Sequence, residues 1–158
     1  SNDTIFVGME AIRGDWTSLA KQFQRALVER MFQDKSKKDI EAFIQDYVRQ
    51  LEEGKFDDLL VYHKKITKPL SHYTKTPPPH VKAARELPHF NGRMVSYVMT
   101  KDGPKHTNLI DEQVAYDYQH YIEKQLKGVS DDLLESFGID FDQVLARRKQ
   151  KGLDQFFG

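Results

Sequence analysis

The sequence predicts a single mainly helical domain with a small β element, an α+β fold. Several segments place apolar residues at helical spacing, and one short segment alternates as a strand does. Of the 158 residues, 39% are hydrophobic, which suffices for the core of one ordinary domain. Since 30% are charged, the core is expected to lie under a heavily charged surface.

The first part of the chain predicts two helices. A short apolar strand over residues 4–7 precedes a helix over about 15–33, for which Asp15 is the expected N-cap. Ser36 is the expected cap of a second helix, and Gly54 stands where a left-handed residue commonly ends one. Because the polar link between them is short, the two helices should form an antiparallel pair.

Prolines divide the middle of the chain. Residues 59–66 are expected to be extended, and Pro69 and Pro79 are each expected to begin a short helix. Alternation over residues 92–99 predicts a strand. The run Asp102-Gly103-Pro104 predicts a turn.

The residue pattern in the last part of the chain predicts three more helices and a tail. The helices are expected over residues 115–126, 130–137 and 140–149. Ser130 is the expected cap of the second of these, and Gly138 its end. A polar tail, residues 150–158, follows, and no helical stripe accounts for its Phe156 and Phe157.

Positive charge is concentrated in the middle of the chain, although the net charge is zero. Residues 60–105 hold nine Lys or Arg against two acids, a net of +7, so the remainder carries −7. A surface polarised in this way steers an anionic partner onto one face. Hydroxyl-bearing and aromatic residues between the cations suit a grip on a polyanion backbone. The alternative is that these lysines are scattered solubilising charges.

No motif in the sequence marks an active site. The six histidines lack the spacing of a metal-binding helix, and there is no cysteine. Neither a glycine-rich phosphate loop nor a nucleophile motif occurs. The acid pairs Asp57-Asp58 and Asp131-Asp132 are expected at helix starts, where carboxylates complement the dipole. We therefore predict no catalytic and no metal-binding residues, and no membrane partner, since no apolar run approaches ~20 residues.

Four motifs, in this order, resemble the B-family DNA polymerases. VGMEAIRGDW, from Val7, is similar to the KGxExxRRDW element at the family's palm-to-thumb junction. TKPLSHY and PHVKAAR resemble its thumb signature, T-[KR]-P-L-x-x-Y and then P-H-V-x-A-A. GRMVSYVM resembles the family's G-x-x-V-x-Y-V strand, and YDYQHYIEKQL its D-x-x-Y-Y-I-x-x-Q-L helix. The sequences of these motifs are most similar to those of the bacterial DNA polymerase II branch of the family.

The resemblance implies a carboxyl-terminal piece of a DNA-directed DNA polymerase, active in replication and repair in the bacterial cytoplasm at the nucleoid. Residues 3–14 would end the palm, 15–149 would be the thumb, and 150–158 a clamp-binding tail; residues 1–2 resemble a tag remnant. The family's metal-binding aspartates would lie upstream of residue 1. The resemblance therefore implies no cofactor and no activity in this segment, and Mg²⁺ in the complete enzyme.

Double-stranded primer–template DNA and the palm are the partners that the resemblance implies. Thumb contacts would hold DNA phosphates without reading sequence. Arg13 and Asp15 match the family's R-R-D near the primer strand, although Gly14 replaces its second arginine. For Tyr62 and Tyr97 two roles stay open, contact with DNA and packing inside the fold. The residues expected to contact DNA are Arg13, Asp15, Lys64, Lys65, Lys68, Ser71, Tyr73, Lys75, His80, Lys82, Arg93 and Lys101.

The tail resembles a second kind of motif. Gln150, Leu153, Phe156 and Phe157 match the Q-x-x-L-x-x-F-F peptides by which polymerases dock on ring-shaped sliding clamps. A flexible peptide of this kind would insert its apolar residues into a pocket and raise the effective concentration of the polymerase on DNA.

Two other functions stay open. A non-enzymatic docking module would act mainly through the phenylalanine tail and would bind a clamp without binding duplex. A free-standing enzyme would need an active site that the sequence does not show.

Overall fold

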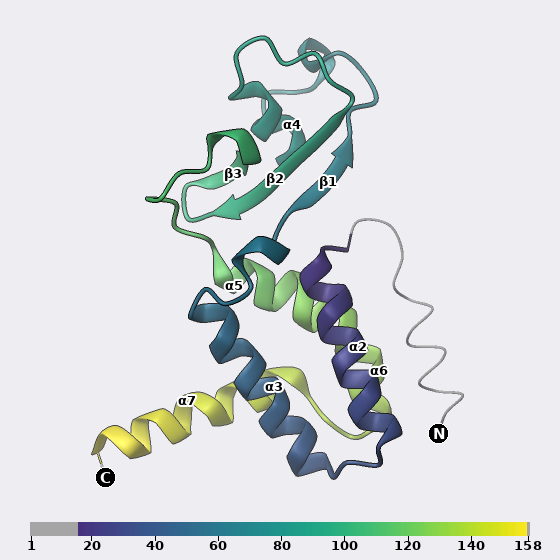
Figure 1. Cartoon of the computed structure of the whole chain (residues 1–158), viewed down its shortest axis with the longest axis vertical. Helices are drawn as coiled ribbons and strands as arrows, with labels where there is room; N and C mark the ends of the chain where they lie inside the picture. Colours follow the sequence, from purple (N-terminus) through teal and green to yellow (C-terminus); the bar gives the residue numbers. More distant parts are fainter. Residues whose placement is uncertain (1–15, 158) are drawn as a thin grey trace.

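A computed structural model of the chain describes residues 16–157, with side chains as far as Leu153, and has two lobes (Figure 1). The lower lobe is helical, and the upper lobe holds a small antiparallel sheet with one helix. The expected fold class, mainly α with a small β element, is confirmed. The DNA contacts expected of Arg13 and Asp15, and the strand expected over residues 4–7, lie outside the described residues.

The two lobes use different parts of the chain. The helical lobe consists of α2 (Ser18–Phe32), α3 (Lys37–Glu52), α5 (Tyr118–Tyr121), the π-helix η4 (Ile122–Lys127), α6 (Gly128–Ser136) and α7 (Phe141–Phe157). The sheet lobe consists of β1 (Tyr62–Lys65), α4 (Pro79–Arg85), β2 (Met94–Thr100) and β3 (Gly103–His106). Single-turn 3₁₀ helices lie at η1 (Asp57–Leu59), η2 (Leu70–His72) and η3 (Thr107–Leu109).

Side-chain caps set the starts of the first two helices. The expectation that Asp15 caps α2 is wrong: the cap is Thr17, whose hydroxyl accepts a hydrogen bond from the backbone N–H of Ala20. Ser36 caps α3 as expected. Gly54 follows α3 with φ 83°, the left-handed conformation that suits glycine after a helix.

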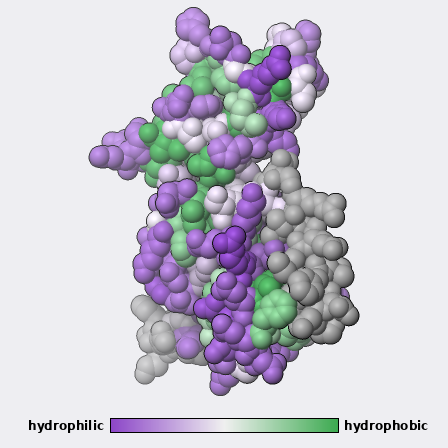
Figure 2. Space-filling model, turned by 45° about the vertical axis from the view of Figure 1, so that its right-hand side comes forward, coloured by the Kyte–Doolittle hydropathy of each residue, from purple (hydrophilic) through white to green (hydrophobic). Residues whose placement is uncertain are grey.

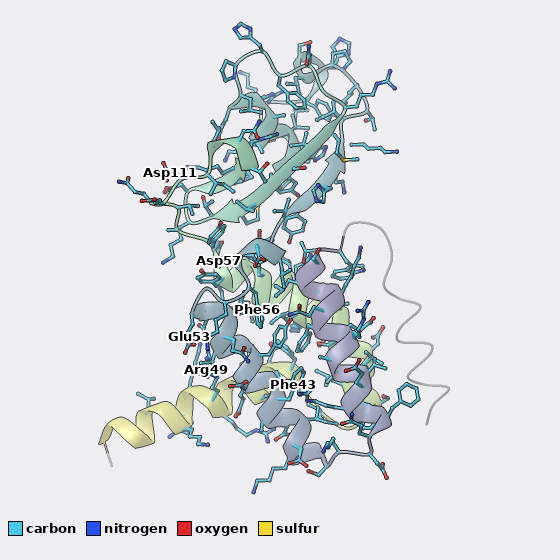
Figure 3. The ribbon with its side chains drawn as sticks, in the orientation of Figure 1. Phe43, Arg49, Glu53, Phe56, Asp57 and Asp111 are labelled. Atoms are coloured by element: carbon cyan, nitrogen blue, oxygen red, sulfur yellow. The ribbon has the colours of Figure 1, made fainter. Side chains whose placement is uncertain are left out.

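Aromatic rings fill the space between α2 and α3. Phe23 is fully buried, and its ring centroid lies 4.9 Å from that of Tyr47. The Tyr47 ring stacks in turn on Phe56 at 4.6 Å. Phe43 and Phe56 mark this layer along α3 in Figure 3. Full burial of a side chain such as Phe23 contributes roughly 1.5–3 kcal/mol, and the partly buried Phe43 and Phe56 contribute less each, so this stack anchors the helical lobe.

The helices predicted over residues 115–126 and 130–137 are one continuous stretch of α5, η4 and α6. Ser130, the expected cap, lies inside α6 and is fully buried. Its hydroxyl donates to the carbonyl oxygen of Leu126 at 2.6 Å, one turn back. A serine whose hydroxyl is satisfied within the helix need not cap one, so the expectation is wrong. Gly138, with φ 70°, follows the end of α6 as expected.

The last helix is longer than the sequence predicts. Asp140 caps α7 by accepting from the backbone N–H of Gln143 at 2.9 Å. The helix then runs to Phe157, past the expected end at residue 149, so the tail continues α7 instead of following it. Two ion pairs join α7 to α3, Arg147–Glu41 at 3.0 Å and Arg148–Glu52 at 2.7 Å.

The sheet has the order β1-β2-β3, with both neighbouring pairs antiparallel. β2 is the predicted strand, but β3 was not expected. The chain turns at Lys101 and Asp102, and Gly103 and Pro104, which were expected in the turn, already belong to β3. Turn-forming residues can begin an edge strand because its outer side needs no ladder hydrogen bonds.

One helix covers one face of the sheet. α4 begins at Pro79 as expected and buries Ala83 and Ala84 against Val95 and Tyr97 of β2. These four residues form a second, smaller core in the sheet lobe. Among the described elements, no helix covers the upper part of the opposite face of the sheet (Figure 1).

Tyrosine hydroxyls join the two lobes. The Tyr121 hydroxyl donates to the carbonyl oxygen of Leu60 at 2.8 Å and accepts from the N–H of Met99 at 2.9 Å. The Tyr118 hydroxyl donates to Asp57 at 2.7 Å, and Asp57 lies between the lobes in Figure 3. These hydrogen bonds therefore attach the helical lobe to the segment before β1 and to β2.

Candidate nucleic-acid interface

A cleft of about 700 Å³ in the sheet lobe collects three of the expected cations. We call it the basic cleft, and it is defined by Lys65, Lys68 and Arg93. Ile66 and Leu70 are among the apolar side chains that line it, and its described lining includes no carboxylate. A concave surface lined by charge of one sign focuses a potential that attracts anions.

Strand pairing positions two of these cations. Lys65 is the last residue of β1 and pairs with Met94 at the start of β2. Beyond the strands, the N–H of Ile66 donates to the carbonyl oxygen of Arg93 at 2.6 Å. The backbones that carry Lys65 and Arg93 are thus held side by side. The Lys68 ammonium lies 4.6 Å from the ring centroid of Tyr73, a cation–π contact.

The loop over residues 67–74 is held by an arginine that sequence reasoning missed. Arg85, in the last turn of α4, donates to the carbonyl oxygens of Leu70 at 2.8 Å, Tyr73 at 3.0 Å and Thr74 at 3.0 Å. The Tyr73 hydroxyl is hydrogen-bonded to Thr67, which lowers the pKa of this phenol. The only sequence signal was a basic residue near the end of a predicted helix.

The expected contact residues do not form one continuous surface. Lys64 pairs with Val95 on the α4 side of the sheet, whereas Lys65 points to the opposite side, because side chains alternate along a strand. The Lys82 ammonium lies 3.7 Å from the position of a Cβ at Gly103, next to the turn that carries Lys101. Ser71 and Lys75 are exposed on the loop between β1 and α4.

His80 does not fit the role expected of it. Its side chain is only 7% exposed, and its ring meets that of Tyr73 edge-on at 6.4 Å between centroids. It packs beneath the loop, so the expectation that it faces phosphate is wrong. Tyr62 and Tyr97 stack on each other at 5.1 Å and pack within the lobe, which settles their open alternative in favour of packing.

The tail residues lie on α7. Residues 149–153 are exposed, and Leu153 is 52% exposed, more than any other large apolar side chain in the described chain. Phe156 and Phe157 lie in the last turn of α7. The peptide expected to be flexible is helical here.

Residues 16–157 contain no group of three or more His, Asp or Glu that could hold a metal ion. The side chains of the described chain therefore do not fit the magnesium site expected of a complete polymerase. Over the same residues, no helix has both the length and the apolar composition needed to span a membrane.

Hydrophilic side chains, drawn in purple, cover much of the upper lobe in Figure 2. A two-lobed α+β domain with a basic cleft belongs to the class of domains whose surface potential attracts a polyanion. A family model described as DNA polymerase family B matches residues 1–136. The chain therefore belongs to DNA polymerase family B, as the motifs predicted.

Relatives from bacteria and archaea agree with this assignment. DNA polymerase II of Escherichia coli (strain K12) is 34% identical over 152 residues, which cover 89% of this chain and 19% of that protein. DNA polymerase 2 of Aeropyrum pernix is 29% identical, with 95% of this chain and 20% of that protein covered. The structure of the family B DNA polymerase from Pyrobaculum calidifontis matches with a TM-score of 0.67 and 29% identity, over 82% of this chain and 19% of the other. The chain thus spans about a fifth of each of these relatives.

Proposed function

We propose that this chain is the thumb of a DNA-directed DNA polymerase and holds primer–template duplex by its phosphates. The observation that carries this proposal is the basic cleft, where Lys65, Lys68 and Arg93 meet without a carboxylate in the described lining. The segment of net charge +7, residues 60–105, contains all of the sheet lobe except His106, so this positive charge lies in one lobe. Duplex DNA carries one negative charge per roughly 1.7 Å of its axis, which this lobe complements.

Binding of this kind positions the duplex without reading its sequence. The ammonium groups of the lysines and the guanidinium group of Arg93 reach phosphate oxygens. The exposed loop residues Ser71 and Lys75 extend the surface next to the cleft. Affinity should then depend on salt more than on base sequence, because each phosphate contact releases counterions.

The test is duplex binding by the whole chain, measured by fluorescence anisotropy at several salt concentrations with two unrelated sequences. The double variant Lys68→Ala, Lys75→Ala should bind both duplexes more weakly and lower the log–log salt slope by about 0.9 per lost contact. The control is Lys35→Ala, Lys38→Ala, which removes the same charge from exposed positions in the helical lobe. A loss that differs between sequences, or an equal loss in the control, contradicts the proposal.

Nucleotide transfer is assigned to the rest of the complete enzyme. The described residues supply no ligand set for the two metal ions that such a reaction uses. We therefore expect the purified chain, with Mg²⁺ and a primed template, to incorporate no labelled nucleotide. Incorporation above background would overturn this part of the proposal.

The tail is proposed to tether the polymerase to a sliding clamp. Gln150, Leu153, Phe156 and Phe157 carry the motif, and Leu153 is already exposed on α7. Capture of the chain on immobilised clamp should be lost in the variant Phe156→Ala, Phe157→Ala and kept in Asp154→Ala. Equal capture of both variants would exclude the motif as the contact.

A non-enzymatic docking module is the second candidate, and the exposure of Leu153 at the end of α7 favours it. The same two measurements separate the candidates. Capture by the clamp without any duplex binding at about 50 mM salt, where phosphate contacts are strongest, would leave docking as the function of this chain.

A further inference from the structure

The two faces of the small sheet differ in what covers them. On one face, Val95 and Tyr97 are buried beneath α4. On the other face, the side chains of β1 and β2 near Lys65 and Met94 lie on the outside, and we call this part the open face. Further along β2 the same face is covered, because Val98 and Thr100 are buried. The open face carries His63, Lys65, Met94, Ser96 and, from β3, Lys105.

The open face is polar and cationic. His63, Lys65 and Met94 are exposed, and Met94 is 47% exposed. The His63 Nδ1 lies 2.8 Å from the Ser96 hydroxyl across the strand pair, so the two side chains form one hydrogen-bonded unit at the surface. The three strands, all within the described chain, contain no Asp or Glu.

The open face continues into the basic cleft. Lys65 and Met94 belong to both, because they pair at the end of the sheet where the cleft begins. Lys65 pairs with Met94 of β2, and Lys105 of β3 pairs with Val98, four residues further along β2. Lys105 therefore lies two strand spacings across the sheet and four residues along it from Lys65. From strand spacing and rise, the two lysines are roughly 16 Å apart, about half of one turn of duplex.

We propose that the open face, together with the basic cleft, is the side of the sheet lobe laid against the duplex, and that α4 faces away from it. This inference rests on the proposed function. Lys65 and Lys105 contact phosphates, the His63–Ser96 pair adds hydrogen-bonding groups between them, and Met94 lies against the sugars. Lys64 and Lys82, on the α4 side, do not contact the duplex.

Adjacent lysines on opposite faces allow a matched test with the whole chain. The open-face variant Lys65→Ala, Lys105→Ala and the α4-side variant Lys64→Ala, Lys82→Ala remove the same charge. The open-face variant should lower the salt slope by about 2 and weaken duplex binding roughly tenfold or more at about 0.1 M salt. The α4-side variant should keep the slope and bind within about twofold of the unsubstituted chain. Equal losses, or a larger loss in the α4-side variant, would overturn the inference.

The absence of cysteine from the chain permits a second measurement. Met94→Cys places a single thiol on the open face, and Lys82→Cys places one on α4; both parent residues are exposed. Saturating duplex should slow alkylation of the first thiol roughly tenfold and leave the second unchanged. Protection of both thiols, of neither, or of position 82 alone would contradict the orientation.

The outcomes also distinguish this inference from the proposed function. If the unsubstituted chain binds no duplex at low salt, the proposed function fails. If it binds and the variants lose affinity in the wrong pattern, only the orientation fails. Thermal unfolding of each variant serves as the folding control. A variant with the same unfolding temperature as the unsubstituted chain has lost contacts with DNA and not its structure.

Discussion

Arg85 shares a basic segment with the proposed DNA contacts but is engaged inside the lobe. Its guanidinium donates to three backbone carbonyl oxygens of the loop that carries Lys68. Arginine suits this task because its planar fork presents several donors in fixed directions. Its charge alone therefore does not make Arg85 available to phosphate.

Substitution of Arg85 by alanine should destabilise the fold. Hydrogen bonds from a charged donor contribute roughly 1.5–3 kcal/mol when well formed, and the exposure of Arg85 lowers this to about 1–2 kcal/mol. Arg85→Lys should recover only part of the loss, since an ammonium cannot make the fork. The measurement is urea unfolding, with Lys82→Ala in the same helix as the control of equal charge. A loss in Lys82→Ala as large as that in Arg85→Ala would contradict the role of these bonds.

Charge density was readable from the sequence, but the direction of each side chain was not. Lys64 and Lys65 are neighbours in the chain and lie on opposite faces of the sheet. The prediction treated them as one surface because the strand register, which decides direction, depends on the partner strand. His80 was misplaced for a related reason, since its burial follows from the loop that Arg85 folds over it.

The helices were largely predictable, but several of their ends were not. Apolar periodicity located α2, α3 and α4 because each buries one stripe. The strand β3 was missed because its Gly103 and Pro104 are typical turn residues, and only pairing with β2 makes them a strand. The break expected at Ser130 did not occur because the π-helix η4 carries the chain through to α6.

α7 gives a prediction at the scale of an element. Its first part is docked: Phe141 and Val144 are buried, and the side-chain amide of Gln45 donates to the carbonyl oxygen of Val144 at 3.1 Å. Its later residues 149–153 are exposed. Truncation after Arg148 should therefore leave the unfolding free energy within about 0.5 kcal/mol, as is usual for changes at exposed positions. Val144→Ala, which opens a cavity beside α3, should cost about 1–3 kcal/mol.

The truncated chain also separates stability from docking. It should bind duplex as the full chain does and lose capture by a sliding clamp. A large drop in its unfolding temperature would show that the end of α7 is part of the core. Undiminished capture by the clamp would place the contact elsewhere in the molecule.

At the scale of the whole molecule, the cationic sheet lobe and the helical lobe share one layer of rings. The ring of Tyr62 in β1 stacks on that of Tyr97, with centroids 5.1 Å apart, and on that of Tyr121, with centroids 5.7 Å apart. The Tyr62 hydroxyl lies 2.7 Å from a ring nitrogen of His120. The helical lobe thus holds the sheet lobe mainly through uncharged aromatic contacts, which do not weaken with salt, and the bond from Tyr118 to Asp57 is the charged contact beside them. Salt-dependent binding measurements should therefore report on DNA contacts and not on the joint.

These buried tyrosines predict loss of stability at alkaline pH. Burial raises the pKa of Tyr47 to about 12, and burial raises the pKa values of Tyr62 and Tyr121 further. In the unfolded chain these phenols ionise near pH 10. Above pH 10 the unfolded state therefore binds fewer protons than the folded state, and the free energy of unfolding falls as pH rises toward the folded pKa values. Each tyrosine can contribute at most about 1.4 kcal/mol per pH unit.

The measurement is urea unfolding between pH 8 and pH 11, compared with Tyr47→Phe. The variant loses a hydrogen bond with Gln22, which shifts its stability by a constant amount. Its slope against pH above 10 should be smaller by up to about 1.4 kcal/mol per unit, because one titrating group is gone. Lysine deprotonation is common to both proteins and cancels in this difference. Equal slopes would mean that Tyr47 reaches solvent in the folded protein, which the stack on Phe23 and Phe56 does not allow.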